Sequence, residues 1–209
     1  MIPFIRKKRA FIRKRKKVGA LSDIIQAMKK PCNKYPGFTL IELMTALVIA
    51  AILLGFGVPS FNTFIKNSRV VTSTNTFITA ANLARSEAIK RGIRVTICKS
   101  SKENKCTNAN KWDQGWIVFT DEDNNAAYNS KKETLLRVSS GLGNNLTLSG
   151  NGGVKNYLSY IGSGQSRKTD GGLQLGTLSL CDDRVGKFGR NITLSSTGRL
   201  SLTTGVACP

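Results

Sequence analysis

The stretch Gly37-Phe38-Thr39-Leu40-Ile41-Glu42-Leu43 opens the apolar run around which the chain is organised. The 21 residues from Phe38 to Val58 contain one charged side chain, that of Glu42. A helix of this length can cross a bilayer core, because each residue adds about 1.5 Å. A carboxylate within a membrane costs about 2.5–3.5 kcal/mol on insertion scales, and intramembrane acids usually serve a function. The run therefore predicts a transmembrane helix whose acid has a role of its own.

A strongly basic segment precedes this run. The 209 residues carry 32 Lys and Arg against 12 Asp and Glu, and residues 1–37 hold 12 of these basic residues against one acid. The clusters Arg6–Arg9 and Arg13–Lys17 favour a cytoplasmic location for this end of the helix. A nucleic-acid-binding tail is the competing interpretation. Met28 offers a second start that would give a ten-residue leader, and we expect translation to begin there.

The order of a basic leader, Gly37, Phe38 and then Glu42 resembles the class III signal of type IV prepilins and type II secretion pseudopilins. The resemblance implies that a prepilin peptidase cleaves after Gly37 and methylates the new amine of Phe38. In a bundle of such helices, the ammonium group of Phe38 in one subunit can pair with Glu42 of its neighbour. Because an unpaired charge is unfavourable in a dry bundle, this pair favours a stagger of one subunit. Glu42 is thus interpreted as an assembly residue and not as a catalytic acid.

The helix is expected to continue past the apolar run as an amphipathic half that ends before Gly92, a plausible C-cap. Gly55, Gly57 and Pro59 predict an interruption or bend between the two halves, because both residue types destabilise helix interiors. Beyond them, apolar residues recur mostly three and four positions apart, which predicts one buried stripe. The stripe comprises Phe61, Phe64, Ile65, Val71, Phe77, Ile78, Ala81, Ala84 and Ala88.

After Gly92 the sequence changes to short β-type runs separated by Gly, Asn and Ser, which predicts an antiparallel β-domain. Leu173, Leu175 and Thr177 alternate with polar Gln174 as in a half-buried strand. The predicted strands are Arg94–Cys98, Trp116–Thr120, Leu135–Val138, Leu146–Leu148, Tyr157–Ile161, Leu173–Leu180 and Ile192–Ser195.

Further stretches narrow the resemblance. Ala84-Arg85-Ser86-Glu87-Ala88 and Trp116-Ile117-Val118-Phe119-Thr120-Asp121-Glu122-Asp123 look like minor pilins and pseudopilins of the GspH/FimT family. The run Leu180-Cys181-Asp182-Asp183-Arg184 and the segment from Arg190 to Arg199 resemble the FimT-like branch. The resemblance implies the type IV pilin fold, an α+β fold in which a long N-terminal helix packs on an antiparallel β-domain. The expected parts are the basic leader at residues 1–37, the transmembrane and assembly half of the helix at 38–59, its amphipathic half at 60–91 and the β-domain at 92–209.

Five cysteines become four once Cys32 leaves with the leader. The remaining four lie beyond the membrane anchor, in an oxidising compartment, where an even number of cysteines suggests disulfides. Three pairings are possible, and we favour Cys98–Cys106 with Cys181–Cys208, since these bonds close one surface loop and tie down the C-terminus. A zinc site is the alternative, but the chain has no histidine and no C-x-x-C spacing.

The absence of histidine also excludes histidine-based nucleophile activation, and no pattern supports an enzyme. Asp121, Asp123 and Asn125 have the spacing that opens a calcium-binding loop. However, Ala126 stands where that loop has its glycine, and Lys132 stands where it has its bidentate glutamate. We therefore favour a solvated hairpin turn over a calcium site and expect neither a metal nor a cofactor.

Basic residues gather in two further places. Lys99, Lys102, Lys105 and Lys111 lie around the first cysteine pair, and Arg184, Lys187, Arg190 and Arg199 lie near the C-terminus. Such residues can bind the phosphates of double-stranded DNA without sequence specificity. FimT-like proteins bind incoming DNA through a Gly-Arg-x-Arg element, which here reads Gly198-Arg199-Leu200-Ser201, with Ser201 in place of the second arginine. A solvated basic surface is the competing interpretation.

The sequence thus predicts a minor type IV pilin, and the alternative is the H-type minor pseudopilin of a type II secretion system. The expected partners are prepilin peptidase, other pilins or pseudopilins and the bacterial inner membrane, and double-stranded DNA is a further candidate. The precursor is expected to cross the inner membrane once, with a periplasmic globular domain, before it enters the fibre.

Overall fold

The computed structural model describes residues 37–102, 105–107, 111–143 and 145–208. The predictions for the basic leader, for Cys32 and for a start at Met28 therefore lie outside the described residues. The described residues divide into two units, with the boundary between Ala51 and Ile52.

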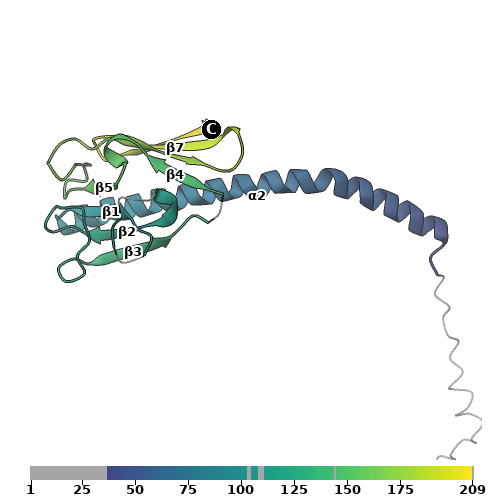
Figure 1. Cartoon of the computed structure of the whole chain (residues 1–209), viewed down its shortest axis with the longest axis horizontal. Coiled ribbons are helices and arrows are strands. Elements are labelled where there is room, and N and C mark those ends of the chain that lie inside the picture. The colour runs from purple at the N-terminus through teal and green to yellow at the C-terminus, as the bar shows by residue number, and fades with distance from the viewer. Residues whose placement is uncertain (1–36, 103–104, 108–110, 144, 209) are drawn as a thin grey trace, which may run out of the picture. The chain divides into compact units, whose positions relative to one another are not determined.

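One long helix, α2, spans the 52 residues Leu40–Arg91 (Figure 1). Of the interruption or bend expected between the two halves, the interruption does not occur, since α2 is continuous through Gly55, Gly57 and Pro59. A proline removes one intrahelical hydrogen bond, and a helix of this length retains the bonds on both sides of it. At the end of α2, Gly92 adopts φ +68° and its N–H donates to a carbonyl oxygen one turn earlier (2.9 Å), which confirms the expected C-cap.

The buried stripe of α2 begins later than the sequence predicted. Phe61 and Phe64 remain 63% and 66% exposed, and the first fully buried side chain is that of Val70. From there the stripe continues at helical spacing through Thr74, Phe77, Ala80, Ala81, Ala84 and Ala88. The two phenylalanines follow the same periodicity, but the β-domain covers the helix only from about Val70 onward.

Four antiparallel strands form the first sheet, in the order β3-β2-β1-β5. Their bounds are Val95–Lys99 for β1, Gly115–Thr120 for β2, Leu135–Ser140 for β3 and Tyr157–Tyr160 for β5. A short 3-10 helix, η1, spans Trp112–Gln114 before β2. Every residue of β1 and β2 is buried, because this sheet is covered on both faces.

The second sheet has the order β4-β6-β7-β8 and is also antiparallel. Its strands are β4 at Thr147–Gly150, β6 at Gly176–Cys181, β7 at Gly186–Leu194 and β8 at Leu200–Cys208, and the 3-10 helix η2 spans Gly152–Val154. β7 begins six residues before the predicted strand that started at Ile192, and β8 was not predicted at all. β6 begins at Gly176, so the predicted strand start at Leu173 is wrong.

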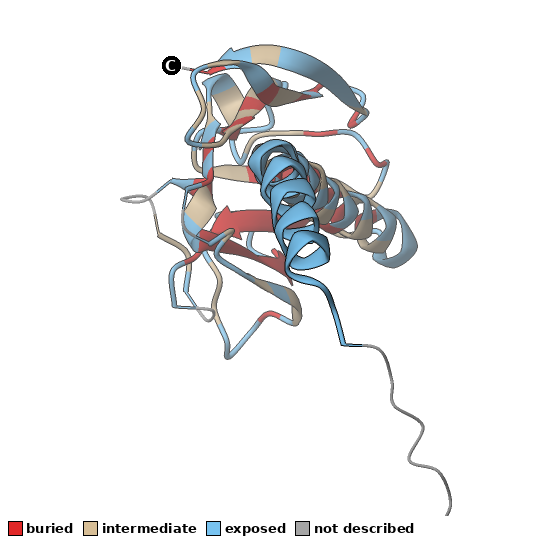
Figure 2. Cartoon of the chain, turned by 90° about the vertical axis from the view of Figure 1, so that its right-hand side faces the viewer, coloured by how far each residue is buried: buried red, intermediate tan, exposed pale blue. Residues whose placement is uncertain are grey.

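One hydrophobic core joins α2 to both sheets. At its centre the ring of Phe77 meets Trp112 and Trp116 edge to face, at centroid distances of 5.4 and 5.2 Å. A second, smaller cluster of Cys98, Ile117 and Phe119 lies on the other face of the first sheet, because side chains alternate along β1 and β2. Figure 2 shows the buried residues concentrated in the strands, whereas the near end of α2 is exposed. The structure thus confirms the α+β class, with one long N-terminal helix on antiparallel sheets.

Candidate functional site

The apolar N-terminal part of α2 is exposed to its surroundings. Every residue from Gly37 to Val58 is exposed, and Phe38 and Phe56 retain 86% and 79% of their accessible surface. The helix is long and apolar enough to cross a membrane by its length and composition. Water is a poor solvent for such a surface, so lipid or neighbouring helices must cover it.

Glu42 lies in the first turn of α2, where the structure adds a local role that the sequence analysis missed. The hydroxyl oxygen of Thr39 accepts a hydrogen bond from the backbone N–H of Glu42 (3.3 Å). Thr39-Leu40-Ile41-Glu42 has the spacing of a capping box, which was the available signal. An acid in the first turn also interacts favourably with the helix dipole. Within the described part of the chain the carboxylate of Glu42 forms no ion pair, so it remains available to a partner.

Two disulfides join the described cysteines in the pairing favoured from the sequence, Cys98 with Cys106 and Cys181 with Cys208. The second bond links the end of β6 to the end of β8 and passes over Gly189 in the intervening strand β7. A Cβ at Gly189 would lie 2.6 Å from the Sγ of Cys208 and 3.1 Å from that of Cys181. Glycine is therefore a steric requirement beneath this disulfide.

The four basic residues proposed for DNA do not form one surface. Arg184 lies in the turn between β6 and β7, where its guanidinium forms an ion pair with Asp182 and donates to the amide oxygen of Asn67 (2.9 Å). The same group stacks over Phe188, 4.1 Å from the ring centroid. These contacts already satisfy much of the donor capacity of Arg184.

The other three are separated by the strand geometry. Arg190 lies on the same side of β7 as the buried residues Ile192 and Leu194, because side chains alternate along a strand. Arg199 is exposed at the turn between β7 and β8. Arg190 pairs with Thr204 in β8, five residues beyond Arg199, which places the two arginines about 17 Å apart along the strand direction at 3.3–3.4 Å per residue. Lys187 is exposed near the start of β7.

The lysines around the first disulfide also differ in exposure. Lys99 is 4% exposed, and its ammonium group donates to the amide oxygen of Asn156 (3.1 Å). Burial, with a smaller contribution from nearby Lys155, lowers the pKa of Lys99. Lys102, Lys105 and Lys111 are exposed. Lys99 is therefore a structural residue, and the exposed positive charge lies on the other three.

The acidic segment after β2 is exposed from Glu122 to Asn125, as the sequence favoured for a solvated turn, but its first residue is not. Asp121 is fully buried, whereas Asp123 and Asn125 are exposed. Glu133, which the sequence analysis did not consider, is also buried and brings a third carboxylate to the same place.

A membrane-competent N-terminal helix with an acid in its first turn, packed on a disulfide-bonded β-domain, defines a subunit of the pilin and pseudopilin class. The chain belongs to the GspH family, whose model, described as "Type II transport protein GspH", matches residues 73–198. The prokaryotic N-terminal methylation motif matches residues 32–58, and it implies processing by a prepilin peptidase and assembly with other pilins or pseudopilins. No curated protein matches the chain significantly.

Two solved proteins are similar in structure. The type IV minor pilin FimU of Pseudomonas aeruginosa has a TM-score of 0.51 at 19% identity, over 70% of this chain and 96% of that one. The minor pseudopilin EpsH of the Vibrio cholerae type II secretion system has a TM-score of 0.40 at 12% identity, over 67% of this chain and 99% of that one. The likeness to FimU supports the pilin fold expected from the sequence.

Proposed function

We propose that this chain is a minor pilin of a type IV pilus, anchored in the inner membrane as a precursor and then packed into a fibre with other pilins. The exposed apolar surface of residues 37–58 is the observation that carries the proposal. Lipid covers this surface before assembly, and the helices of neighbouring subunits cover it afterwards. The two disulfides suit a globular domain on the periplasmic side, because such bonds persist in oxidising compartments.

In the proposed fibre, Glu42 sets the register between subunits. Cleavage after Gly37 would create an ammonium group at Phe38, and that group would pair with Glu42 of a neighbouring helix. The available carboxylate of Glu42 supports this role. A buried charge without a partner is strongly unfavourable, so the pair would penalise any other stagger.

The experiment must separate this role of Glu42 from its position in the capping box. Glu42→Gln keeps a residue type that suits the box but removes the charge, whereas Glu42→Ala removes both. We expect both variants to be processed normally and to be lost from sheared fibres, and Gly37→Ala to accumulate as uncleaved precursor. Immunoblots of the membrane fraction measure processing, and immunoblots of the sheared fibre fraction measure incorporation. Normal incorporation of Glu42→Gln would reduce Glu42 to a helix-capping residue and would contradict the register.

The choice of a type IV pilus rests on the C-terminal run around Cys181 and Arg190, which resembles the FimT-like branch. The alternative, an H-type minor pseudopilin of a type II secretion system, is favoured by the description of the matched family. Deletion of the gene in its source organism discriminates the two. We expect fewer surface pili and unchanged secretion of exported enzymes. Normal pili with a loss of secretion would assign the chain to the secretion system.

DNA binding is a second candidate function, supported by the exposure of Lys187 and Arg199. Among the described residues, neither side chain forms an ion pair. Because a few phosphate contacts give weak binding, we expect micromolar or weaker affinity that falls steeply with salt. Ser201 is exposed in β8, two residues after Arg199, so Ser201→Arg should tighten binding.

Polarisation titrations of the full chain in detergent with duplex DNA, at two salt concentrations, test this second candidate. Lys187→Gln with Arg199→Gln should weaken binding, and Arg190→Gln should weaken it less. Arg184→Gln is the matched control for lost charge, since its guanidinium is already engaged by Asp182. Equal binding by wild type and the double variant would leave the structural role alone.

A further inference from the structure

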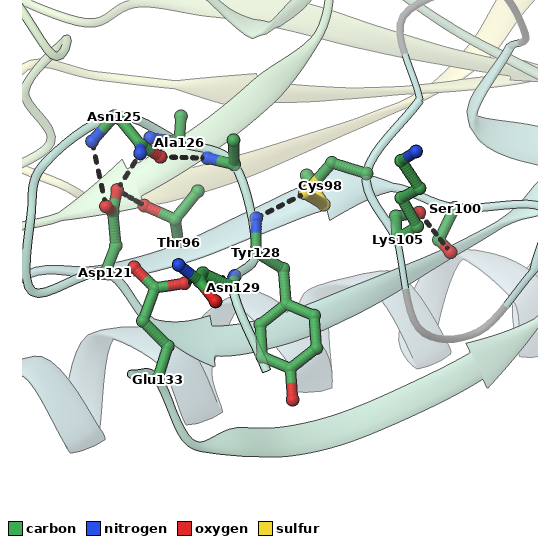
Figure 3. The surroundings of a disulfide bond; sticks show 12 residues. Thr96, Cys98, Ser100, Lys105, Asp121, Asn125, Ala126, Tyr128, Asn129 and Glu133 are labelled. Carbon is green, nitrogen blue, oxygen red and sulfur yellow. Dashed lines mark hydrogen bonds between the residues drawn. A yellow bond between two sulfur atoms is a disulfide. The ribbon is translucent and has the colours of Figure 1, made fainter. Parts of the chain in front are cut away.

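Three carboxylates converge at the two ends of the loop that connects β2 to β3. Asp121 follows the last residue of β2 directly, and Glu133 lies two residues before β3. With Asp123 they place one oxygen atom each within 4.8 Å of the others. Figure 3 shows Asp121 and Glu133 on these neighbouring segments, with Asn125 and Ala126 above them.

The loop holds Asp121 in a fixed position. Its Oδ2 accepts hydrogen bonds from the hydroxyl of Thr96 (2.7 Å) and the N–H of Ala126 (3.1 Å), and its Oδ1 accepts one from the N–H of Asn125 (3.0 Å). The buried guanidinium of Arg94 donates to the side-chain oxygen of Asn124 (2.8 Å) and so anchors the same turn. The first ligand group is therefore preorganised by neighbouring strands and by its own loop.

Glu133 has the opposite property, since part of its carboxylate has no hydrogen bond. The residue is 7% exposed, and its Oε2 accepts a hydrogen bond from the N–H of Asn129 (2.7 Å). Its Oε1 is buried and has no hydrogen-bond partner among the described residues. Burial is the largest cause that raises the pKa of Glu133; the backbone N–H groups of Asn129 and Glu122 oppose this rise, and the carboxylates of Asp123 and Asp121 add to it. A buried carboxylate oxygen without a donor is strongly unfavourable, so the geometry calls for a positive charge at this position.

No described side chain supplies that charge. None of the three carboxylates forms an ion pair within residues 37–102, 105–107, 111–143 and 145–208. Lys132 is exposed and lines the same surface hollow as Asp123 and Glu133, but it forms no ion pair with either carboxylate. The donor atoms are all oxygens, which suit hard cations. Zinc prefers nitrogen and sulfur, and the chain has no histidine, while the cysteines nearest to the cluster form a disulfide.

We propose that Asp121, Asp123 and Glu133 form a calcium site that closes the β2–β3 loop. Calcium accepts six to eight oxygen ligands in adaptable geometry, so a loop that supplies three carboxylates can complete its shell with water and backbone oxygens. Magnesium demands a near-ideal octahedron and gives up its waters reluctantly, so this irregular loop suits it less. Calcium sites in extracellular modules bind with Kd values of about 10⁻⁴–10⁻³ M, and we expect an affinity in that range.

Bound calcium would stabilise the β2–β3 loop, which packs against the first sheet. Tyr128 lies in the same loop, where its backbone N–H donates to the Sγ of Cys106 (3.3 Å) and its ring packs against Phe119 at a centroid distance of 5.4 Å. The cation would join the two ends of the loop that carries these contacts. It would thereby hold the loop, the first disulfide and the smaller hydrophobic cluster together.

The structure also explains why the sequence pattern pointed away from calcium. Counted from Asp121, the glutamate of a helix-flanked calcium loop would stand at position 132, which is a lysine. Here the loop is flanked by two antiparallel strands, so the chain comes back to Asp121 one residue later than in a helix-flanked loop. Glu133, and not residue 132, therefore meets Asp121. The template failed because it assumes flanking helices.

The test is isothermal titration of the full chain in detergent with calcium chloride after treatment with a chelator, and with magnesium chloride as a comparison. At about ten times Kd, calcium should raise Tm by about 3–5 °C. Glu133→Gln and the exposed Asp123→Asn should weaken calcium binding at least about tenfold. Glu122→Gln is the matched control, because it removes the same charge at the residue next to Asp121. Glu122 lies outside the group of three carboxylates, so this variant should bind calcium as the wild type does.

Three results would overturn the site. The first is a wild-type chain that shows neither heat of binding nor a change in Tm with calcium. The second is an equal loss of affinity in Glu122→Gln and Glu133→Gln, which would indicate diffuse attraction to an acidic surface. The third is an unchanged affinity in both Glu133→Gln and Asp123→Asn.

Discussion

Gln174 shows how a single buried amide can organise a turn region. Its side chain is fully buried, where its Oε1 accepts a hydrogen bond from the N–H of Ser159 (2.9 Å). Its Nε2 donates to the carbonyl oxygens of Gly153 (2.9 Å) and Tyr157 (3.0 Å). The amide thus pairs backbone groups from β5 and η2 that no strand ladder reaches. Its neighbours Leu173 and Leu175 are exposed, which reverses the alternation expected from the sequence.

We predict that Gln174→Ala lowers the free energy of unfolding by about 3 kcal/mol or more. It leaves the buried N–H of Ser159 and the partly buried carbonyl oxygens of Gly153 and Tyr157 unpaired, and each unpaired buried group costs about 1–3 kcal/mol. Gln165→Ala is the matched control, because Gln165 is exposed and its amide oxygen accepts a hydrogen bond from the side chain of Arg167 (3.0 Å). Thermal unfolding followed by circular dichroism compares the two. Similar Tm values for both variants would contradict the structural role of Gln174.

Gly189 provides a second test at this scale. Gly189→Ala should destabilise the chain, since a Cβ would lie 2.6 Å from the Sγ of Cys208 and 3.0 Å from the carbonyl oxygen of Val206. In a background with Cys181→Ser and Cys208→Ser the same substitution should cost less, because the disulfide no longer passes over the strand. A double-mutant cycle of Tm measurements gives the coupling. Equal effects in the two backgrounds would exclude the disulfide as the cause.

At the scale of elements, α2 contains two glycines that the described residues do not require. A Cβ at Gly55 or Gly57 would meet no heavy atom within 4 Å. Neither glycine has the positive φ that other residues avoid. Packing among the described residues therefore does not explain them, and we infer that they allow this helix segment to loosen during fibre assembly.

We predict that Gly55→Ala with Gly57→Ala stabilises the helix and impairs assembly. Each glycine lowers helix stability by about 1 kcal/mol relative to alanine. Circular dichroism in detergent measures the helix, and immunoblots of sheared fibres measure assembly. Asn62→Ala also raises helix propensity, but it lies beyond Pro59 and should assemble normally. Unimpaired assembly of the double alanine variant would show that this segment need not loosen.

At the scale of the whole molecule, the disulfides differ in how much of the chain they close. Cys181 and Cys208 are 27 residues apart, and their bond holds β6 and β8 together across β7. Cys98 and Cys106 are 8 residues apart, and their bond closes the loop after β1. In the chain-entropy description, the longer loop stabilises the folded state more because it removes more freedom from the unfolded chain.

We therefore predict that replacing Cys181 and Cys208 by serine lowers stability by about 3–4 kcal/mol, and replacing Cys98 and Cys106 by about 2–3 kcal/mol. Thermal unfolding of the full chain gives the order of the two effects. Peptide mapping without reduction should recover the two pairs. Free thiols in the purified protein, or the opposite order of stability, would contradict this prediction.

Local sequence was sufficient for the features that depend on neighbours along the chain. The single acid in the apolar run from Phe38 to Val58, the C-cap at Gly92 and the centres of most strands all follow from composition and spacing. The pairing of Cys98 with Cys106 was favoured on the same basis, since eight residues readily form one loop. In each case the interacting residues lie within a few turns of one another.

Tertiary structure decided what depends on a partner distant in sequence. β8 is an edge strand whose residues are mostly exposed, so it carries no apolar alternation and became visible only through its pairing with β7. Phe61 satisfies the helical periodicity but lies where no sheet covers the helix. Glu133 meets Asp121 because β2 and β3 are neighbours in an antiparallel sheet. Sequence periodicity determines which residues share a face, but only the arrangement of the other elements determines what that face meets.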